Sequence, residues 1–202
     1  MISAEYCSSL FLSCIEQYHM TDDVNVVCPI LSSDSIHDIL INKVWIDTIQ
    51  WHLEDIMRRP ELEVGIFIET KRRIDLLNQE RTDLVERIDD WFMNQFKDVI
   101  LIENPRLNTE TPAWVIDRLS ILMLKIYHMN EQTQRLDAGE EHLKLCNKKL
   151  ETLLAQKLDL SFSLNTFLTE LGTGIAQMKV YRQMKMYNDP STNPELYQKK
   201  FS

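Results

Sequence analysis

Apolar side chains recur along most of this chain at intervals of three and four residues, the spacing that places them on one face of an α-helix. The clearest run comprises Leu143, Cys146, Leu150, Leu153, Lys157, Leu160, Leu164, Phe167 and Leu171. A second comprises Ile74, Leu77, Arg81, Leu84, Ile88 and Trp91. Alternating steps of three and four over several heptads are typical of a helix–helix seam. The pattern therefore predicts two long helices in a bundle.

Residues that start and stop helices divide the rest of the chain. Ser35 can cap a helix, Pro60 and Pro112 suit first turns, and Gly172 and Gly174 suit a helix end. The predicted helices cover residues 4–18, 36–58, 60–96, 112–134, about 140–172 and 175–186. We expect an all-α, single-domain bundle of about five to six helices. It would comprise an N-terminal helix and connector (1–35), a bundle core (36–187) and a C-terminal tail (188–202).

Charge and composition narrow the possible partners. The 202 residues include 31 acidic and 22 basic side chains, so the net charge is −9, which disfavours binding to nucleic acid. No apolar stretch reaches the ~20 residues of a membrane helix, and the N-terminus lacks the basic start of a signal peptide. The four cysteines form no C-x-x-C pair. The sequence thus predicts a cytoplasmic protein with reduced thiols and no membrane span.

Polar residues interrupt the apolar faces at a few positions. Asn42 lies on the apolar face of helix 36–58, Lys157 lies in the seam of the longest helix, and Arg81 lies in the other seam near Asn78. Burial of such groups costs free energy unless they are paired. Each could make one local hydrogen bond, or Asn78 and Arg81 could line a polar pocket.

Helix 112–134 gathers four polar groups on one strip: Asp117, Arg118, Lys125 and His128. Arginine, lysine and histidine together could bind a phosphate or carboxylate, although a solvated helix face explains them equally well. The candidate ligand-binding residues are Asp55, Arg58, Asn78, Arg81, Asp83, Arg118, Lys125 and His128. For an enzyme pocket, six of them would need to converge: Asp55, Asn78, Arg81, Asp83, Arg118 and His128.

A second set of residues could contact a protein partner. Trp51 projects away from the predicted core face of its helix, and the end of the chain is basic and aromatic. The candidate partner-binding residues are Trp51, Tyr181, Arg182, Lys185 and Tyr187. Alternatively, other parts of the chain cover Trp51, and residues 181–197 dock on the acidic helix 60–96, held mainly by their tyrosines.

Known chemical motifs are largely missing from the sequence. It contains no P-loop, no G-x-G-x-x-G and no G-x-S-x-G. A di-iron bundle needs two E-x-x-H motifs, whereas only Glu16 and His19 match, and His128 and Glu131 run in reverse. The sequence therefore predicts no metal site, and it identifies neither a cofactor nor a catalytic residue.

Several runs together carry a family resemblance. They include WHLED at 51–55, KRRIDLLNQER at 71–81, DRLSI at 117–121 and KIYHM at 125–129. These runs resemble the bacterial family known as domain of unknown function 4254, over residues 36–197. Thr82 stands where that family is expected to have asparagine. The resemblance implies an all-helical bacterial protein with a role accessory to cell-envelope glycan synthesis, and it supplies no activity.

Two functions follow as expectations. The first is a non-catalytic binding or interaction protein, with an unknown protein partner or a small anionic ligand. The second is an enzyme that acts on a small phosphorylated or carboxylated metabolite in a polar pocket among helices 36–58, 60–96 and 112–134.

Overall fold

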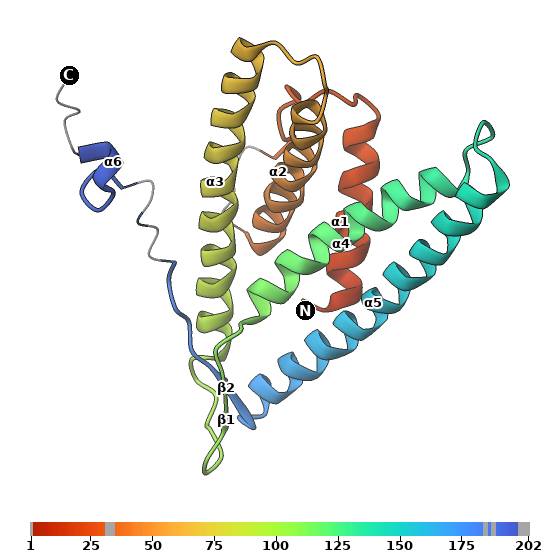
Figure 1. Ribbon diagram of the computed structural model, residues 1–202. Helices are drawn as coiled ribbons and strands as arrows, with labels where there is room; N and C mark the ends of the chain where they lie inside the picture. Colours follow the sequence, from red (N-terminus) through yellow and green to blue (C-terminus); the bar gives the residue numbers. More distant parts are fainter. Residues whose placement is uncertain (1, 31–34, 184–185, 187–188, 198–202) are drawn as a thin grey trace.

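The computed structural model describes residues 2–30, 35–183, 186 and 189–197, and it confirms the predicted all-α bundle. Its helices are α1 (Ala4–His19), α2 (Ile36–Met57), α3 (Val64–Phe96), α4 (Pro112–Thr133), α5 (Glu140–Gly172) and the short α6 (Pro194–Tyr197). In Figure 1, α2 and α3 form one upright pair, α4 and α5 form a second, slanted pair, and α1 lies behind α4. None of the helices described combines the length and apolar character that crossing a bilayer requires.

Local chemistry sets where the helices begin. Ser3 and Ser35 are the N-caps of α1 and α2, and their side chains accept hydrogen bonds from the backbone N–H groups of Tyr6 and Asp38. Pro112 opens α4, where a missing N–H group costs nothing. These boundaries match the predictions because each depends only on neighbouring residues.

The main core lies where α1, α2, α3 and α4 meet. Its fully buried side chains include Phe11, Ile15, Leu40, Ile88 and Leu119. A smaller apolar cluster fills the space between α1, α2 and α3, formed by Tyr18, Trp45, Ile49, Leu53 and Ile74. The cores hold α2 on several sides, which explains why it is buried around much of its circumference.

The predicted seam of α5 is only partly buried. Cys146, Leu164, Phe167 and Leu171 are buried, whereas Leu150, Leu153 and Leu160 are only half-buried. Along much of its length α5 packs against α4 alone and faces open space on its other side. All nine predicted seam residues are nevertheless buried or half-buried, which confirms the seam, and its first half is shallow because α2 and α3 diverge from α5 (Figure 1).

One short strand and irregular chain take the place of the helix predicted over residues 175–186, of which residues 184 and 185 lie outside the described part of the chain. β2 (Ala176–Met178) pairs in parallel with β1 (Arg106–Asn108), and Ala176 stands opposite Arg106. Gly174 adopts a positive φ of 72° that turns the chain out of α5, and its carbonyl accepts from the N–H group of Ile102. The helix prediction was wrong because the backbone here pairs with the α3–α4 connection instead of with itself.

Candidate binding site

Four charged side chains from three helices form a buried network in the bundle. Lys43 and Asp47 on α2 are ion-paired one turn apart, and the Lys43 ammonium lies 2.9 Å from Asp117 Oδ1 on α4. Arg81 on α3 donates to Asp117 Oδ1 at 3.0 Å, and its Nε lies 3.2 Å from Asp47 Oδ1. Ser120 donates to Asp47 Oδ2 at 2.5 Å. Two cations thus balance two carboxylates in a region where Lys43 is 0% exposed.

The network shifts the ionisation of its own members. Burial alone would raise the pKa of the Asp117 carboxyl, but the charges of Lys43 and Arg81 outweigh burial and lower this pKa. Burial also lowers the pKa of Arg81, but Asp47 and Asp117 attract its charge and raise the pKa above its ordinary value. Asp117 and Arg81 therefore stay charged at neutral pH, and their attraction ties α3 to α4.

The sequence pointed to half of this network. Arg81 was recognised because it interrupts a seam, and Asp117 because it lies on a polar strip. Lys43 and Asp47 were missed, although they lie one turn apart inside an apolar run, which is a recognisable signal. The polar interruption that the sequence predicts on this helix is Asn42, whose side chain donates to the Asp38 carbonyl at 3.0 Å.

An open cleft lies beside this network. Residues of α5 line one side, residues of α2 and α3 line the other, and residues of α4 line it throughout. Three adjoining cavities of about 560, 640 and 400 Å³ make it up. Lys125 lines the first and second, Arg81 lines the second and third, and Trp51 and Asp55 line the first and third. Volumes of this size are typical of small-molecule sites.

The first cavity combines apolar walls with polar groups. Trp51, Met129 and Leu153 supply apolar surface. Its charged and polar lining residues are Asp55, Lys125, His128, Gln132, Lys149 and Thr152. Neither Lys125 nor Lys149 forms an ion pair with any described residue, so both ammonium groups can meet a ligand.

Six of the eight residues predicted to bind a ligand line the three cavities. They are Asp55, Arg58, Arg81, Arg118, Lys125 and His128. Asn78 instead accepts a hydrogen bond from Gln50 at 2.7 Å, and Asp83 accepts one from Gln79 at 2.7 Å. Asn78 and Asp83 line none of these three cavities, so the six residues required for an enzyme pocket do not meet in one cavity.

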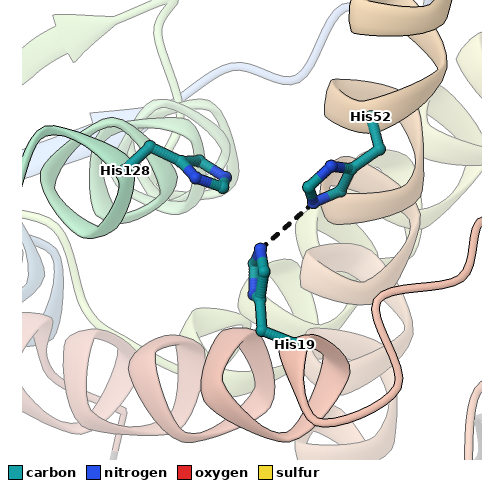
Figure 2. Close-up of side chains that lie close together, drawn as sticks. All are labelled: His19, His52 and His128. Atoms are coloured by element: carbon teal, nitrogen blue, oxygen red, sulfur yellow. Dashed lines mark hydrogen bonds between the residues drawn. The ribbon is translucent and has the colours of Figure 1, made fainter. Parts of the chain in front are cut away.

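Three histidines converge next to the cleft. His19 on α1, His52 on α2 and His128 on α4 point their rings toward one another (Figure 2). The Nε2 atoms of His19 and His52 are 3.1 Å apart, and one ring nitrogen from each histidine lies within 4.8 Å of the others. Only His128 was predicted to be functional, because the other two lie on helices that the sequence gave no reason to bring together.

Aromatic rings hold each of these imidazoles. Tyr127 stacks on His19 with ring centres 4.5 Å apart. Tyr18 stacks on His52 at 5.3 Å, and Trp51 stacks on His128 at 5.1 Å.

Burial, followed by the nearby imidazoles of His19 and His128, lowers the pKa of His52. Its ring is therefore neutral at neutral pH, which leaves a nitrogen lone pair on the side chain.

Of the residues predicted to bind a partner, the structure places Trp51 in the cleft and Arg182 against α3. Trp51 is half-buried in the cleft. Arg182, which follows β2, lies against the surface of α3, where it pairs with Asp90 and donates to the Glu86 carbonyl at 3.0 Å. Lys185 and Tyr187 lie outside the described residues.

Among its described residues, the C-terminal segment contacts α3 at its start only. Arg182 pairs with Glu86 and Asp90 on the acidic face of α3, whereas α6 stands apart from the bundle (Figure 1), so docking is seen at Arg182 and not at residues 194–197. Tyr181 and Tyr197 are 61% and 54% exposed, so the expectation that tyrosines supply most of the hold is wrong for these two. The contact is made by the Arg182 guanidinium and not by the tyrosines, because its partners, the carboxylates of Glu86 and Asp90, lie on the surface of α3.

These features define an all-α bundle with a ligand-sized cleft beside a buried charge network. The chain belongs to the family of proteins of unknown function DUF4254, which matches residues 37–180 and confirms the resemblance noted in its sequence. Neither a curated protein nor a solved structure matches the chain. Because the family description names no activity, the function is argued below from the residues.

Proposed function

We propose that the protein is a non-catalytic binding protein for a small phosphorylated or carboxylated metabolite, held in the cleft between α2, α4 and α5. Lys125 and Lys149 carry this proposal, because both line the first cavity and neither is ion-paired with a described residue. Two lysine ammonium groups that meet at one cavity, without an ion-pair partner among the described residues, favour an anionic ligand there.

The aromatic wall of the cleft favours a ligand that contains a ring. Trp51 is fixed by its stacking on His128, with an interplanar angle of 12°, and it lines two of the three cavities. A preoriented indole gives a ring a large contact area at little entropic cost. A phosphorylated sugar has both the ring and the charge. Binding such a ligand would connect the cleft with cell-envelope glycan synthesis.

The alternative is an enzyme that acts on the same class of ligand. Asp55 and His128 line the same cavity, and carboxylates and imidazoles are the usual general bases and acids. Product formation from a bound ligand, lost in Asp55→Asn, would favour this alternative. Binding without turnover would favour the binding protein.

A thermal-shift screen tests the proposal. Sugar phosphates, nucleotides and dicarboxylates are added to the wild-type chain and to Lys125→Ala and Lys149→Ala. We expect at least one ligand to raise the melting temperature of the wild type, and both variants to lose most of that rise. Lys148→Ala is the matched control, because Lys148 neighbours Lys149 on α5 but lines none of the three cavities. Equal shifts in the variants and the wild type, or no shift with any ligand, would contradict the proposal.

A further inference from the structure

We propose that His19, His52 and His128 bind a zinc ion or another divalent transition metal ion through their Nε2 atoms. The three side chains come from three different helices, and their rings face one another (Figure 2). Imidazole is a preferred ligand of zinc, copper, nickel and iron. This inference does not rest on the proposed metabolite: the two sites share His128, which also lines the first cavity, but His19 and His52 line none of the three cavities, and a metal ion is another kind of ligand.

The hydrogen bonds of two rings leave the correct nitrogen free for a metal. His19 Nδ1 lies 2.7 Å from the Ile15 carbonyl oxygen, and His128 Nδ1 lies 2.9 Å from a Glu131 carboxylate oxygen. Both oxygens only accept hydrogen bonds, so each Nδ1 carries a proton and each neutral ring has its lone pair on Nε2. A second hydrogen bond of this kind accompanies most metal-binding histidines.

The Nε2 atoms of the three histidines are not all satisfied by hydrogen bonds within the described part of the chain. His128 Nε2 is buried and has no hydrogen-bond partner among the described residues. His52 Nε2 lies 3.1 Å from His19 Nε2 and, without a metal ion, donates to its lone pair. When a metal binds, His52 must carry its proton on Nδ1 instead, which is the other neutral tautomer of the same ring.

The separations suit a tetrahedral ion after a small adjustment. Two nitrogens bound at about 2.0–2.1 Å to a tetrahedral zinc ion lie about 3.3 Å apart. The pair His19 and His52 already has this spacing, at 3.1 Å. The largest separation in the cluster, at most 4.8 Å, exceeds the ideal by about 1.5 Å. Small shifts shared among the three side chains would close that difference when the ion binds.

The surroundings suit a cation held in place. Asp22 Oδ1 lies 3.8 Å from His52 Nε2, and Glu131 is bonded to His128, so two carboxylates offset the charge of the ion. Tyr127, Tyr18 and Trp51 stack on the three imidazoles and restrict their rotation. Ligands with restricted motion lose less entropy when the metal binds.

Zinc binding by the full chain tests the inference. The chain is stripped with a chelator and dialysed against Zn²⁺, and the bound zinc is measured by elemental analysis. We expect one zinc ion per wild-type chain, and loss of that ion in His19→Ala, His52→Ala and His128→Ala. The matched controls are His37→Ala and His142→Ala, which replace the two histidines outside the cluster and should keep the ion.

A further variant keeps the test decisive if the alanine substitutions prevent folding. Glu131 is exposed, so Glu131→Ala should fold normally, and loss of its bond to His128 should weaken zinc affinity about 10–100-fold. The proposal is overturned if the wild-type chain binds no zinc, if folded cluster variants keep the ion, or if Glu131→Ala binds with unchanged affinity. Each of these results would mean that the imidazoles form only an aromatic packing cluster.

Discussion

Lys43 and Asp47 are ionisable side chains that are buried in the middle of α2, among apolar residues. Moving charges out of water costs several kcal/mol per ion, and only a well-formed set of partners offsets that cost. Removal of one partner is therefore worse than removal of a balanced pair. Two cations and two carboxylates make this balance testable.

We predict that Lys43→Met lowers the free energy of unfolding by about 3–5 kcal/mol, because Asp47 and Asp117 would then share one cation. The double substitution Lys43→Met and Asp47→Leu should cost less than Lys43→Met alone, since it leaves Arg81 and Asp117 as a balanced pair. Urea denaturation measures the three proteins under the same conditions.

Lys71→Met serves as the control for this series. Lys71 pairs with Asp75 at the same spacing on α3, but both side chains are about half exposed. Its loss should change stability by about 0–1 kcal/mol. A double variant that is as unstable as Lys43→Met alone, or less stable, would show that charge balance does not govern the site.

Asp89 on α3 gives a prediction about pH. It is 2% exposed, and burial raises its pKa to about 6, against the opposing effects of Thr111 and Arg182. The folded pKa lies above the ordinary value of 3.8, so the folded state takes up a proton before the unfolded chain does. This residue therefore opposes folding above pH 6, and stability recovers as the pH falls from about 6 to about 4.

Asp89→Asn should therefore raise the free energy of unfolding by about 2–3 kcal/mol at pH 8. The difference should shrink to near zero at about pH 4, where the wild-type carboxyl is protonated in the folded state. Chemical denaturation of both proteins across this range measures it. A difference that stays constant with pH would show that Asp89 does not titrate in this way.

At the scale of elements, helices were predictable wherever their ends depend on local chemistry. Ser35, Pro112 and Gly172 marked real boundaries because capping and backbone conformation involve only neighbouring residues. The pairing of β2 with β1 was not predictable, because the partner lies far along the chain and three-residue strands leave no periodic pattern. Periodicity also identified the apolar face of α5 without showing how much of it another helix covers.

Gly174 connects α5 with this strand pair and gives a prediction at the same scale. It has a φ of 72°, and a Cβ at this position would lie 2.3 Å from the Ile100 carbonyl oxygen. Gly174→Ala should lower the free energy of unfolding by about 2–4 kcal/mol, because both the backbone conformation and the contact disfavour a side chain.

Gly172→Ala is the matched control two residues earlier. There a Cβ would meet only a Phe96 side-chain atom, at 3.8 Å. This change should be neutral or stabilise by about 0.5 kcal/mol, since alanine favours the helix. Thermal unfolding compares both variants, and equal stability of the two would contradict the role assigned to Gly174.

At the scale of the whole molecule, the site depends on how the helices meet. Arg81 could be predicted because it is a charge in a seam, and Lys125 and His128 because they share a strip. His19 and His52 could not, since their convergence with His128 requires the packing of three helices. Asn78 and Asp83 lie on α3 with Arg81, but they accept hydrogen bonds from Gln50 and Gln79 and do not line the cleft.

The arrangement of the two helix pairs produces the proposed binding cleft. Because α5 leaves α2 and α3 along part of its length, Lys149 and Leu153 face Trp51 and Asp55 across open space. The chain has a net charge of −9, yet this space contains two lysines without ion pairs among the described residues. The central claim is that a ring-bearing anion occupies it.

A crystal structure of the full chain with the ligand that gives the largest thermal shift tests this claim most directly. We predict density for the ligand in the cleft, with its ring against Trp51 and its phosphate or carboxylate within hydrogen-bonding distance of Lys125 or Lys149. Density for the ligand elsewhere on the molecule, with this cleft empty at saturating concentration, would contradict the account.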